Sequence, residues 1–309
     1  AFTQDALEEQ LLSEPIDSIM SLSSFLEMQG RSAHASHTIR VITLKNGLVG
    51  IFKTGAYHYA EVAAYRLSKF LGFSLIPPTV YRTIEGKPGS LQLYIDASDL
   101  RSSSDPKKML KKCGDEAIIK MKLFCYVAGQ WDTHLGNQIV FQVADKYHLA
   151  LIDNSGILHR SYSRYGGAQF IARGEENKDV ITDMSSEFPF HKAKTVSKID
   201  SELKRTFQAF LTTSHIRSLA SEELTYVLWN QSLWIKWPSH KSGFSSFTRR
   251  YYSSVLDGLS KLTREHLELA WAELLIFDRN YVNDLISLTL KRRDEVINHA
   301  VSVGEIIED

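Results

Sequence analysis

The segment Gly129–Phe141, GQWDTHLGNQIVF, combines residue types that can do chemistry. Asp132 and Asn137 stand five positions apart in it, so one loop can direct both side chains to one point. Asp153 then ends the apolar run HLALI. A carboxylate at the end of a buried strand needs a partner, and a divalent metal ion is a suitable one. Phosphoryl transfer uses a carboxylate base with carboxylate and amide metal ligands, so this pattern predicts a site for ATP and a metal ion.

Two earlier residues fit the same chemistry. Lys53 ends the strand-like segment VGIFKTG, where its charge could neutralise phosphates, and Glu61 follows eight residues later near the start of an apolar helix. Each has a simpler explanation alone, since lysines often end exposed strands and glutamate is favoured at helix N-termini. Asp132 and Asn137 are likewise common in turns. No one of these residues indicates function alone. Together, in the order Lys, Glu, Asp, Asn, Asp, they indicate a functional set.

The elements before these loops mix strands with helix. Asn46-Gly47 separates two apolar, β-branched runs and predicts a hairpin with a type I′ turn, in which both central residues have positive φ. The next segment, HYAEVAAYRLSKFLGF, predicts a helix that stops at Gly72. We expect residues 1–28 to be helical, two strands around a Gly/Pro turn within 76–96, and an inter-lobe connection at 98–108.

The second part of the chain is mainly helical in pattern. GDEAIIKMKLFCYVAGQW predicts a buried helix leading into the loop of Asp132, and a short hairpin should follow over 138–152. Residues 156–192 predict a long loop of the kind often found near function. Further helices are expected at 197–212, 217–231, 260–277 and 279–302.

Composition excludes several classes of protein. The 309 residues carry 36 Lys+Arg and 36 Asp+Glu, and this zero formal charge gives no argument for nucleic acid as a partner. No apolar run reaches the ~18 residues that a membrane span needs, and the acidic N-terminus does not resemble a signal peptide. Two cysteines, Cys113 and Cys125, favour a reducing, cytoplasmic compartment and leave no zinc motif. Cys125 is expected in the core.

Three stretches resemble known proteins: AEVAAYRLSKFLGFSLIPPTVYR with GSLQLYI, then DTHLGNQIV, then LALIDNSG. They are similar to atypical kinases, a group that spans phosphatidylinositol-kinase-like bacterial proteins, including effectors, and the secretory-pathway casein kinase family. The resemblance covers roughly residues 45–160. It implies that Lys53 contacts the nucleotide phosphates, that Glu61 pairs with Lys53 or helps to hold a metal, and that Asp132 is the catalytic base. Asn137 and Asp153 would be ligands of Mg²⁺ or Mn²⁺.

The resemblance also implies contacts with the rest of ATP. Residues 93–96 would form the hinge that meets adenine. The chain lacks the Gly-rich phosphate cover of protein kinases, and its nearest equivalent is GRSAHASH, whose hydroxyls, amides and Arg31 would cap phosphates. The nucleotide contacts implied beyond Lys53 and Glu61 are therefore Arg31, Leu93, Tyr94 and Asp96.

The pattern departs from the group in three places. Thr133 stands where an arginine is usual, Asp153-Asn154-Ser155-Gly156 replaces Asp-Asn-Gly, and the spacing between Lys53 and Glu61 is shorter than in ordinary protein kinases. The short spacing favours the atypical group. Thr133 keeps a pseudokinase that binds nucleotide and regulates a partner as an alternative.

We expect an α+β, two-lobed atypical protein-kinase-like fold. Its parts are an N-terminal helical segment (1–28), an N-lobe with an antiparallel sheet and one helix (29–100), and a larger helical C-lobe (101–309). The expected activity is transfer of the γ-phosphoryl group of ATP to Ser/Thr of a protein, in a cytosol, including the host cytosol reached by a bacterial effector. A phosphoinositide lipid kinase is the alternative, and the mixed charges of 156–192 favour protein only weakly.

A second set of residues concerns regulation. WIKWPSHKSGFSSFTRRYY interleaves basic and aromatic residues, which suits an anionic ligand such as inositol hexakisphosphate, an activator of some kinases in the wider group. A solvated basic loop explains the same residues. The candidate contacts are Lys236, Lys241, Arg249 and Arg250.

Overall fold

The computed structural model describes residues 3–31, 39–55, 57–130, 135–154, 157–158, 250–277, 279–303 and 305–309. Asp132, the loop expected at 156–192 and the helices expected at 197–212 and 217–231 lie outside the described residues, as do Lys236, Lys241 and Arg249. Arg250 is described only through its backbone.

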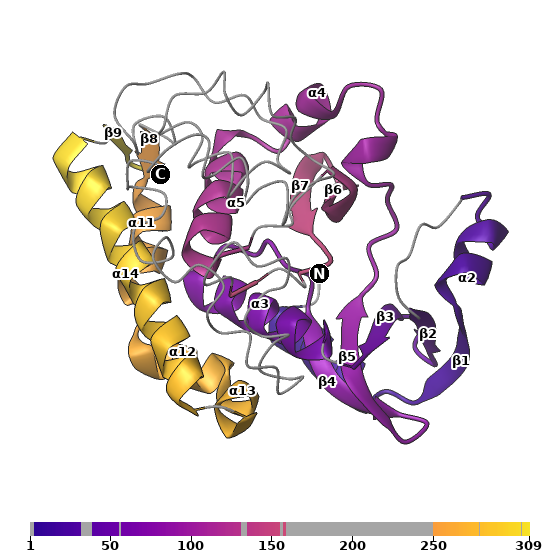
Figure 1. Cartoon of the computed structure of the whole chain (residues 1–309). Helices are drawn as coiled ribbons and strands as arrows, with labels where there is room; N and C mark the ends of the chain where they lie inside the picture. The colour runs from indigo at the N-terminus through magenta and orange to yellow at the C-terminus, as the bar shows by residue number, and fades with distance from the viewer. Residues whose placement is uncertain are drawn as a thin grey trace, which may run out of the picture.

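A five-stranded antiparallel sheet forms the N-terminal lobe (Figure 1), with the order β1-β2-β3-β5-β4. Helices α1 (Gln4–Ser13) and α3 (Tyr57–Leu71) pack against β4 and β5. Gly72 ends α3 in the left-handed region with φ 68°, as predicted. The strands are β1 (Ile16–Ser21), β2 (Arg40–Leu44), β3 (Val49–Thr54), β4 (Thr79–Ile84) and β5 (Lys87–Leu93).

The turn at Asn46-Gly47 differs from the prediction in type. Asn46-Gly47 does join β2 and β3, but only Gly47 has positive φ, 88°, and its N–H donates to the Leu44 carbonyl at 2.8 Å. This is the longer hairpin loop in which a type I turn is followed by a left-handed glycine. The type I′ pattern occurs instead between β4 and β5, where Glu85 and Gly86 have φ of 51° and 74°.

The prediction of a helical segment over residues 1–28 is wrong in its middle. Helix α1 ends before Pro15, because a residue that precedes proline is disfavoured in the helical region. The next six residues pair with β2 as the edge strand β1. A second helix, α2 (Leu22–Met28), follows, with Ser21 as its N-cap. Over 16–21, pairing with β2 outweighed the helical spacing of the apolar residues.

The second lobe is built around α5 (Asp115–Ala128), with the hairpin of β6 (Gln138–Val143) and β7 (Lys146–Leu151) beside it. Both were predicted. The helix expected at 260–277 is instead three short helices, because Thr263 starts a new helix with a capping box that uses His266. The remaining elements are η1 (Leu100–Ser102), α4 (Pro106–Lys111), η2 (Leu135–Asn137), β8 (Arg250–Tyr252), α11 (Ser253–Lys261), α12 (Arg264–Ala270), α13 (Ala272–Phe277), α14 (Arg279–Val303) and β9 (Glu305–Ile307).

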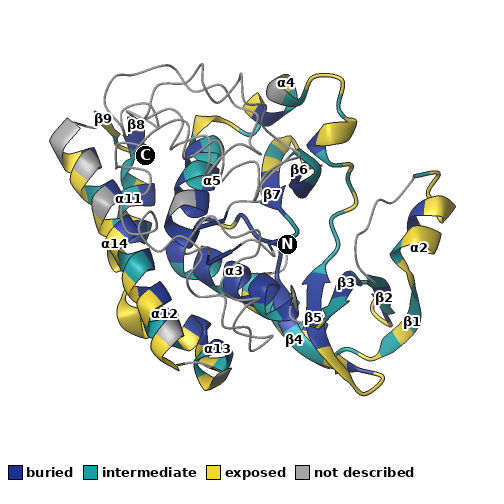
Figure 2. Ribbon diagram, in the orientation of Figure 1, coloured by how far each residue is buried: buried dark blue, intermediate teal, exposed yellow. Residues whose placement is uncertain are grey.

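Helix α3 lies between the sheet and the C-terminal helices, and its dark blue stretch in Figure 2 is almost fully buried. On one side Lys69 pairs with Asp5 and Glu8 of α1, each at 2.6 Å. On the other, Arg66 pairs with Glu273 of α13 at 2.7 Å. The helix that carries Glu61 is therefore held by segments from both ends of the described chain.

Two further observations bear on the sequence predictions. Cys125 is fully buried and both cysteines are free thiols. Within the described ranges, no helix combines the length and apolar character needed to cross a bilayer.

Candidate active site

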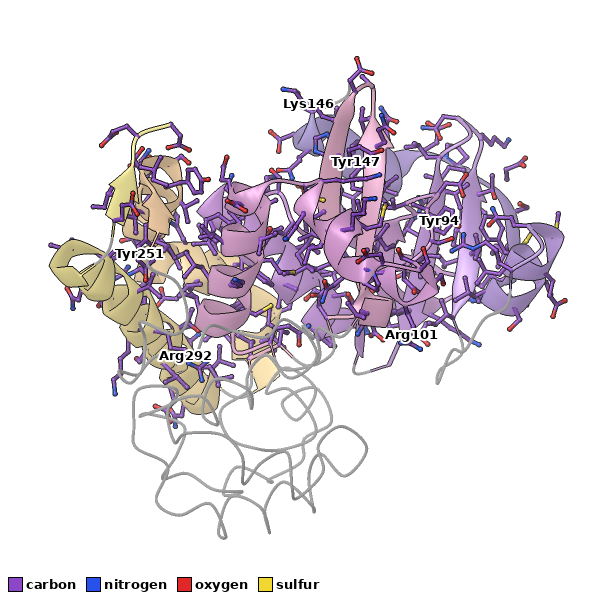
Figure 3. All side chains as sticks on the ribbon, turned by 90° about the horizontal axis from the view of Figure 1, so that it is seen from above. Tyr94, Arg101, Lys146, Tyr147, Tyr251 and Arg292 are labelled. Carbon is purple, nitrogen blue, oxygen red and sulfur yellow. The ribbon has the colours of Figure 1, made fainter. Side chains whose placement is uncertain are left out.

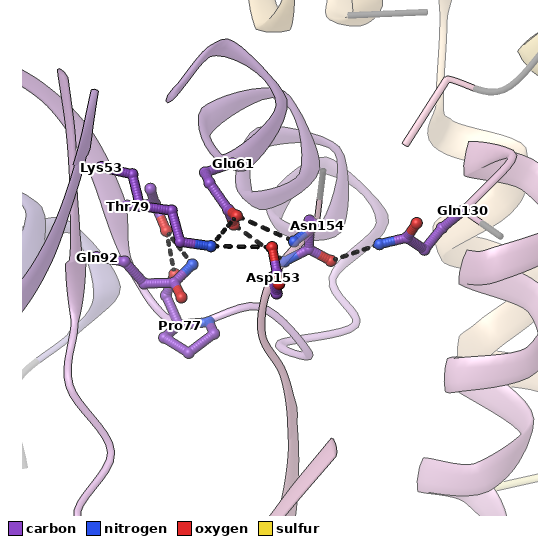
Figure 4. Close-up of polar contacts among 8 residues, drawn as sticks. All are labelled: Lys53, Glu61, Pro77, Thr79, Gln92, Gln130, Asp153 and Asn154. Atoms are coloured by element: carbon purple, nitrogen blue, oxygen red, sulfur yellow. Dashed lines mark hydrogen bonds and ion pairs between the residues drawn. The ribbon is translucent and has the colours of Figure 1, made fainter. Parts of the chain in front are cut away.

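Lys53 is the centre of a buried ionic cluster (Figure 4). Residues on a strand alternate between its faces, so Ile51 and Lys53 share one face of β3 while Phe52 enters the sheet's hydrophobic core. The Lys53 Nζ donates to Glu61 Oε1 at 2.7 Å and to Asp153 Oδ1 at 3.0 Å. Lys53 and Glu61, eight residues apart, thus meet Asp153, which lies 100 residues after Lys53. All three were selected from residue type and order.

Glu61 is held from two directions. Its side chain is 1% exposed, and while Oε1 binds Lys53 it also accepts the backbone N–H of Asn154 at 3.1 Å. The Asn154 Nδ2 donates to Glu61 Oε2 at 3.4 Å. A buried carboxylate with this many donors is fixed in position, so Glu61 fixes Lys53 in turn.

Charge balance keeps Lys53 protonated. Burial lowers the pKa of this lysine, but the carboxylates of Asp153 and Glu61 outweigh that effect and raise the pKa well above its usual value. The ammonium group is therefore charged throughout the neutral pH range. A permanent positive charge at the inner end of a cleft suits phosphate oxygens.

Asp153 and Asn154 follow β7 after Ile152. Asp153 has positive φ, 54°, a conformation uncommon for a residue other than glycine and often found where a side chain is aimed for function. Its side chain is 39% exposed and faces the cleft, whereas Asn154 is fully buried and directed at Glu61. Adjacent residues thus serve opposite purposes, one open to a ligand and one structural.

Gln130 and Asn137, on either side of residues 131–134, bind the segment that carries Asp153. Before these residues, the Gln130 Nε2 donates to Asn154 Oδ1 at 3.3 Å. After them, the Asn137 carbonyl accepts the backbone N–H of Ile152 at 2.9 Å. Both flanking residues therefore bind the segment 152–154 that carries Asp153.

A cleft of about 530 Å³ opens beside this cluster. This volume falls within the roughly 300–1,000 Å³ typical of ligand sites. Its inner end is polar and its outer end is apolar. The lining residues are Leu22, Leu26, Gly30, Arg31, Ile39, Ile51, Lys53, Gln92, Leu93, Tyr94, Ile95, Ala97, Ser98, Asp99, Ser102, Gly136, Asn137, Ile139, Ile152 and Asp153.

Some, but not all, of the predicted nucleotide contacts line this cleft. Leu93 and Tyr94 line the cleft, whereas Asp96 is exposed and absent from the lining. Arg31 also lines the cleft, but its guanidinium binds the Tyr94 hydroxyl at 3.0 Å and the Ala97 carbonyl at 3.3 Å. Arg31 thus lies against Tyr94 and Ala97 rather than beside Lys53.

Sequence reasoning missed the residues that support the cluster. Asn154 and Gln130 were overlooked because amides in turns are common, although Asn154 directly follows Asp153. Gly136 was also missed: a Cβ there would collide with the Arg101 guanidinium, so only glycine lets that cation lie against the turn before Asn137.

The donor set fits a hard cation. Among the described residues no three His, Cys, Asp or Glu side chains gather as a metal cluster. Asp153 and Asn137 nevertheless both face the cleft and offer carboxylate and amide oxygens. Mg²⁺ is usually bound by one or two such groups together with phosphate oxygens and water.

Comparisons with known proteins give a fold. No protein-family model and no curated protein matches the chain. A crystal structure of the Golgi casein kinase with Mn/ADP bound superposes with a TM-score of 0.50 at 13% identity, covering 98% of this chain and 76% of that one. The chain has a protein-kinase-like fold. This confirms the predicted two-lobed α+β architecture, and the identity is low enough that the likeness concerns the fold alone.

Two other kinase structures superpose less well. Another structure of the Golgi casein kinase gives a TM-score of 0.48 at 14% identity, covering 97% of this chain and 74% of that one. The proinflammatory kinase CtkA of Helicobacter pylori gives 0.41 at 11%, covering 93% and 97%.

Proposed function

We propose that the protein is an atypical kinase that transfers the γ-phosphoryl group of ATP to a Ser/Thr hydroxyl of a protein, with Mg²⁺ or Mn²⁺. One observation carries the proposal. Lys53 is held between Glu61 and Asp153 at the inner end of a cleft large enough for a nucleotide. A fixed lysine beside an accessible carboxylate is the arrangement that phosphate and metal recognition require.

The cleft offers a place for each part of ATP. Ile51, Leu93, Ile139 and Ile152 would pack on adenine at the apolar end. Lys53 would bind phosphate oxygens, since its charge persists at neutral pH. Bound metal would offset negative charge on the phosphates, with Asp153 and Asn137 as its protein ligands.

Asp132 completes the proposed reaction. It would accept the proton of the acceptor hydroxyl as the hydroxyl oxygen bonds to the γ-phosphorus and the bond from that phosphorus to the β–γ bridging oxygen breaks, releasing ADP. Support comes from Gln130 and Asn137, which flank Asp132 in sequence and are both tied to the segment of Asp153. Positioning and electrostatics can supply most of the catalysis of such a transfer.

The proposed acceptor is a protein, and the proposed setting is a cytosol. The Asp153-Asn154 pair resembles the casein kinase side of the group, which favours protein over phosphoinositide. Two free thiols, Cys113 and Cys125, suit a cytosol, including that of a host entered by an effector. Activation by inositol hexakisphosphate through Lys236, Lys241, Arg249 and Arg250 remains part of the proposal, as does the alternative of a pseudokinase.

The test is incubation with γ-labelled ATP and Mg²⁺ or Mn²⁺, with mixed protein and phosphoinositide acceptors and with or without inositol hexakisphosphate. Wild type is compared with Lys53→Met, Asp132→Ala and Asp153→Asn. Lys87→Met and Asp145→Asn are matched controls at exposed positions. Label on protein in wild type and in both controls, but not in the three site variants, supports the proposal. Label on lipid with the same pattern favours the phosphoinositide kinase. Nucleotide binding without transfer would identify a pseudokinase.

A further inference from the structure

Helix α2 is part of the wall of the cleft. Leu22 and Leu26 face the cavity, and Leu26 is 8% exposed. Phe25 meets the Tyr94 ring edge-on, with centroids 5.2 Å apart. These three residues form one stripe at helical spacing, and the rest of α2 is exposed. The short helix therefore covers the outer end of the cleft with its only apolar face.

The end of α2 determines where Arg31 lies. Gly30 adopts φ 69°, the Arg31 N–H donates to the Leu26 carbonyl at 2.8 Å, and the Gly30 N–H donates to the Glu27 carbonyl at 2.9 Å. This pair of bonds is a Schellman motif, which reverses the chain directly after a helix. The reversal fixes the Arg31 backbone to α2 itself.

The Arg31 side chain then joins α2 to the hinge. Its two terminal nitrogens bind the Tyr94 hydroxyl and the Ala97 carbonyl, and the Gln29 Oε1 also accepts from the Tyr94 hydroxyl at 3.3 Å. Tyr94 lies between the sheet and the β6–β7 hairpin (Figure 3). A planar guanidinium with several donors holds two acceptors in one geometry. Arg31 thus closes a bridge from the covering helix to the hinge.

The opposite end of α2 provides a pivot. The Leu22 N–H donates to the Ile39 carbonyl at 3.1 Å, and Ser21 caps the helix where the edge strand β1 ends. One end of α2 is therefore continuous with the sheet, and the other is held to the hinge by side chains. Breaking the side-chain contacts would free the outer end without removing a strand.

We propose that α2 is a lid over the adenine end of the nucleotide site and that Arg31 is the latch which holds it closed on Tyr94. This inference rests on the proposed function, since it concerns how long that site retains a nucleotide. Arg31 is a positioning residue here and contacts the hinge rather than phosphate. Loss of the latch raises the dissociation rate of the nucleotide, and it raises the KM for ATP by a larger factor than it changes kcat.

Stopped-flow release of a fluorescent N-methylanthraniloyl-ADP tests the latch in the full chain. Arg31→Ala and Tyr94→Phe should each release the nucleotide about tenfold faster, because one or two hydrogen bonds to a charged group are lost. Tyr94→Phe removes one oxygen and keeps the ring packed on Phe25, so folding is preserved. Arg40→Ala is the control, an arginine on the same sheet that pairs with Glu85 outside the cleft.

The outcomes separate the two proposals. Faster release in both latch variants, with KM for ATP raised more than kcat is changed and with unchanged release from Arg40→Ala, supports the lid. Unchanged release from Arg31→Ala and Tyr94→Phe, while Lys53→Met weakens binding, overturns the lid and leaves the nucleotide site standing. No binding of the probe by wild type overturns both.

Discussion

The two ends of the cleft are built on different principles. The inner end is a buried ionic cluster in which Glu61, Lys53 and Asn154 hold one another, with side chains from strand, helix and turn. The outer end is an exposed assembly, where the Arg31 side chain reaches Tyr94 from a helix of seven residues. Mutual contacts fix the side chains of the inner end before any ligand binds, whereas a few side-chain contacts hold the outer end.

The difference indicates a division of labour. Preorganised charge accelerates a reaction because no reorganisation is needed when charge develops. A cover must open to admit and release ligand, so it is held by a few contacts at the surface. We therefore expect changes at the inner end to affect chemistry and stability together, and changes at the outer end to affect mainly binding kinetics.

Glu61→Gln should have the largest effect. The amide keeps the shape and can still accept from Asn154, but Lys53 loses one of its two carboxylates. We expect activity to fall at least about a hundredfold and unfolding free energy to fall by on the order of 1–3 kcal/mol, since Asp153 still pairs with the buried lysine. Urea unfolding and the labelled-ATP assay measure the two effects.

Glu85→Gln is the matched control, because Glu85 is an exposed partner of Arg40 on the same sheet. It should change stability by less than about 1 kcal/mol. Equal effects of the two glutamine substitutions would contradict the contrast between buried and exposed charge.

Asn154→Ala should come next. Glu61 loses the Asn154 Nδ2 donor and Gln130 loses its acceptor, both in a buried setting. The backbone N–H of Asn154 remains, so we expect a loss of about 1–3 kcal/mol. Activity should fall less than in Glu61→Gln. A thermal melt and an ADP titration of each variant rank the losses of stability and of nucleotide binding. Larger losses in Asn154→Ala than in Glu61→Gln would contradict the assignment of Glu61 as the main support of Lys53.

Lys122 on α5 is a half-buried lysine whose pKa shifts in the opposite direction to that of Lys53. Burial lowers the pKa of Lys122 on α5 to about 7, although Asp115 raises it in part. Below pH 7 this lysine is charged in both folded and unfolded states, and burial of the charge destabilises the fold. As pH rises toward 10.5, the unfolded state holds more protons, so stability should increase.

Lys122→Met should remove that pH dependence and stabilise the protein at pH 6 by about 1–2 kcal/mol. The raised pKa of Lys53 gives no change between pH 6 and 9, because its stabilising contribution persists below 10.5 and is lost only at higher pH. Urea midpoints of wild type and Lys122→Met at pH 6 and 9 test both statements. Parallel curves would rule out Lys122 as the source.

Gly30→Ala should have the smallest effect. Alanine is strained at φ 69°, at a cost of about 1 kcal/mol, and no neighbouring atom obstructs the added methyl. The helix end and the latch should loosen slightly, with nucleotide release a few times faster and activity at saturating ATP retained. Gly86→Ala, at φ 74° in the β4–β5 turn, carries the same strain away from the cleft and should leave release unchanged.

The sequence predicted the inner end better than the outer end. Lys53, Glu61 and Asp153 were found because their chemistry requires particular residue types in a particular order. Leu26 was expected only to lie in a helical segment, and Arg31 was predicted to cap phosphates. Nothing local indicates that a helix before the first hairpin returns to cover Tyr94. The position of α2 follows from the pairing of β1 with β2. The helical spacing of apolar residues in this segment gave no sign of that strand.

The contacts of α3 also set an order for folding. The Trp271 Nε1 donates to the Ala63 carbonyl at 3.3 Å, and Arg66 reaches Glu273, each across more than 200 residues of chain. During synthesis the N-terminal part emerges first, so the helix that carries Glu61 waits for segments made much later. Such separated contacts slow folding. A ribosome-bound chain stopped before residue 260 should therefore lack the contacts that hold α3 from the side of Trp271 and Glu273.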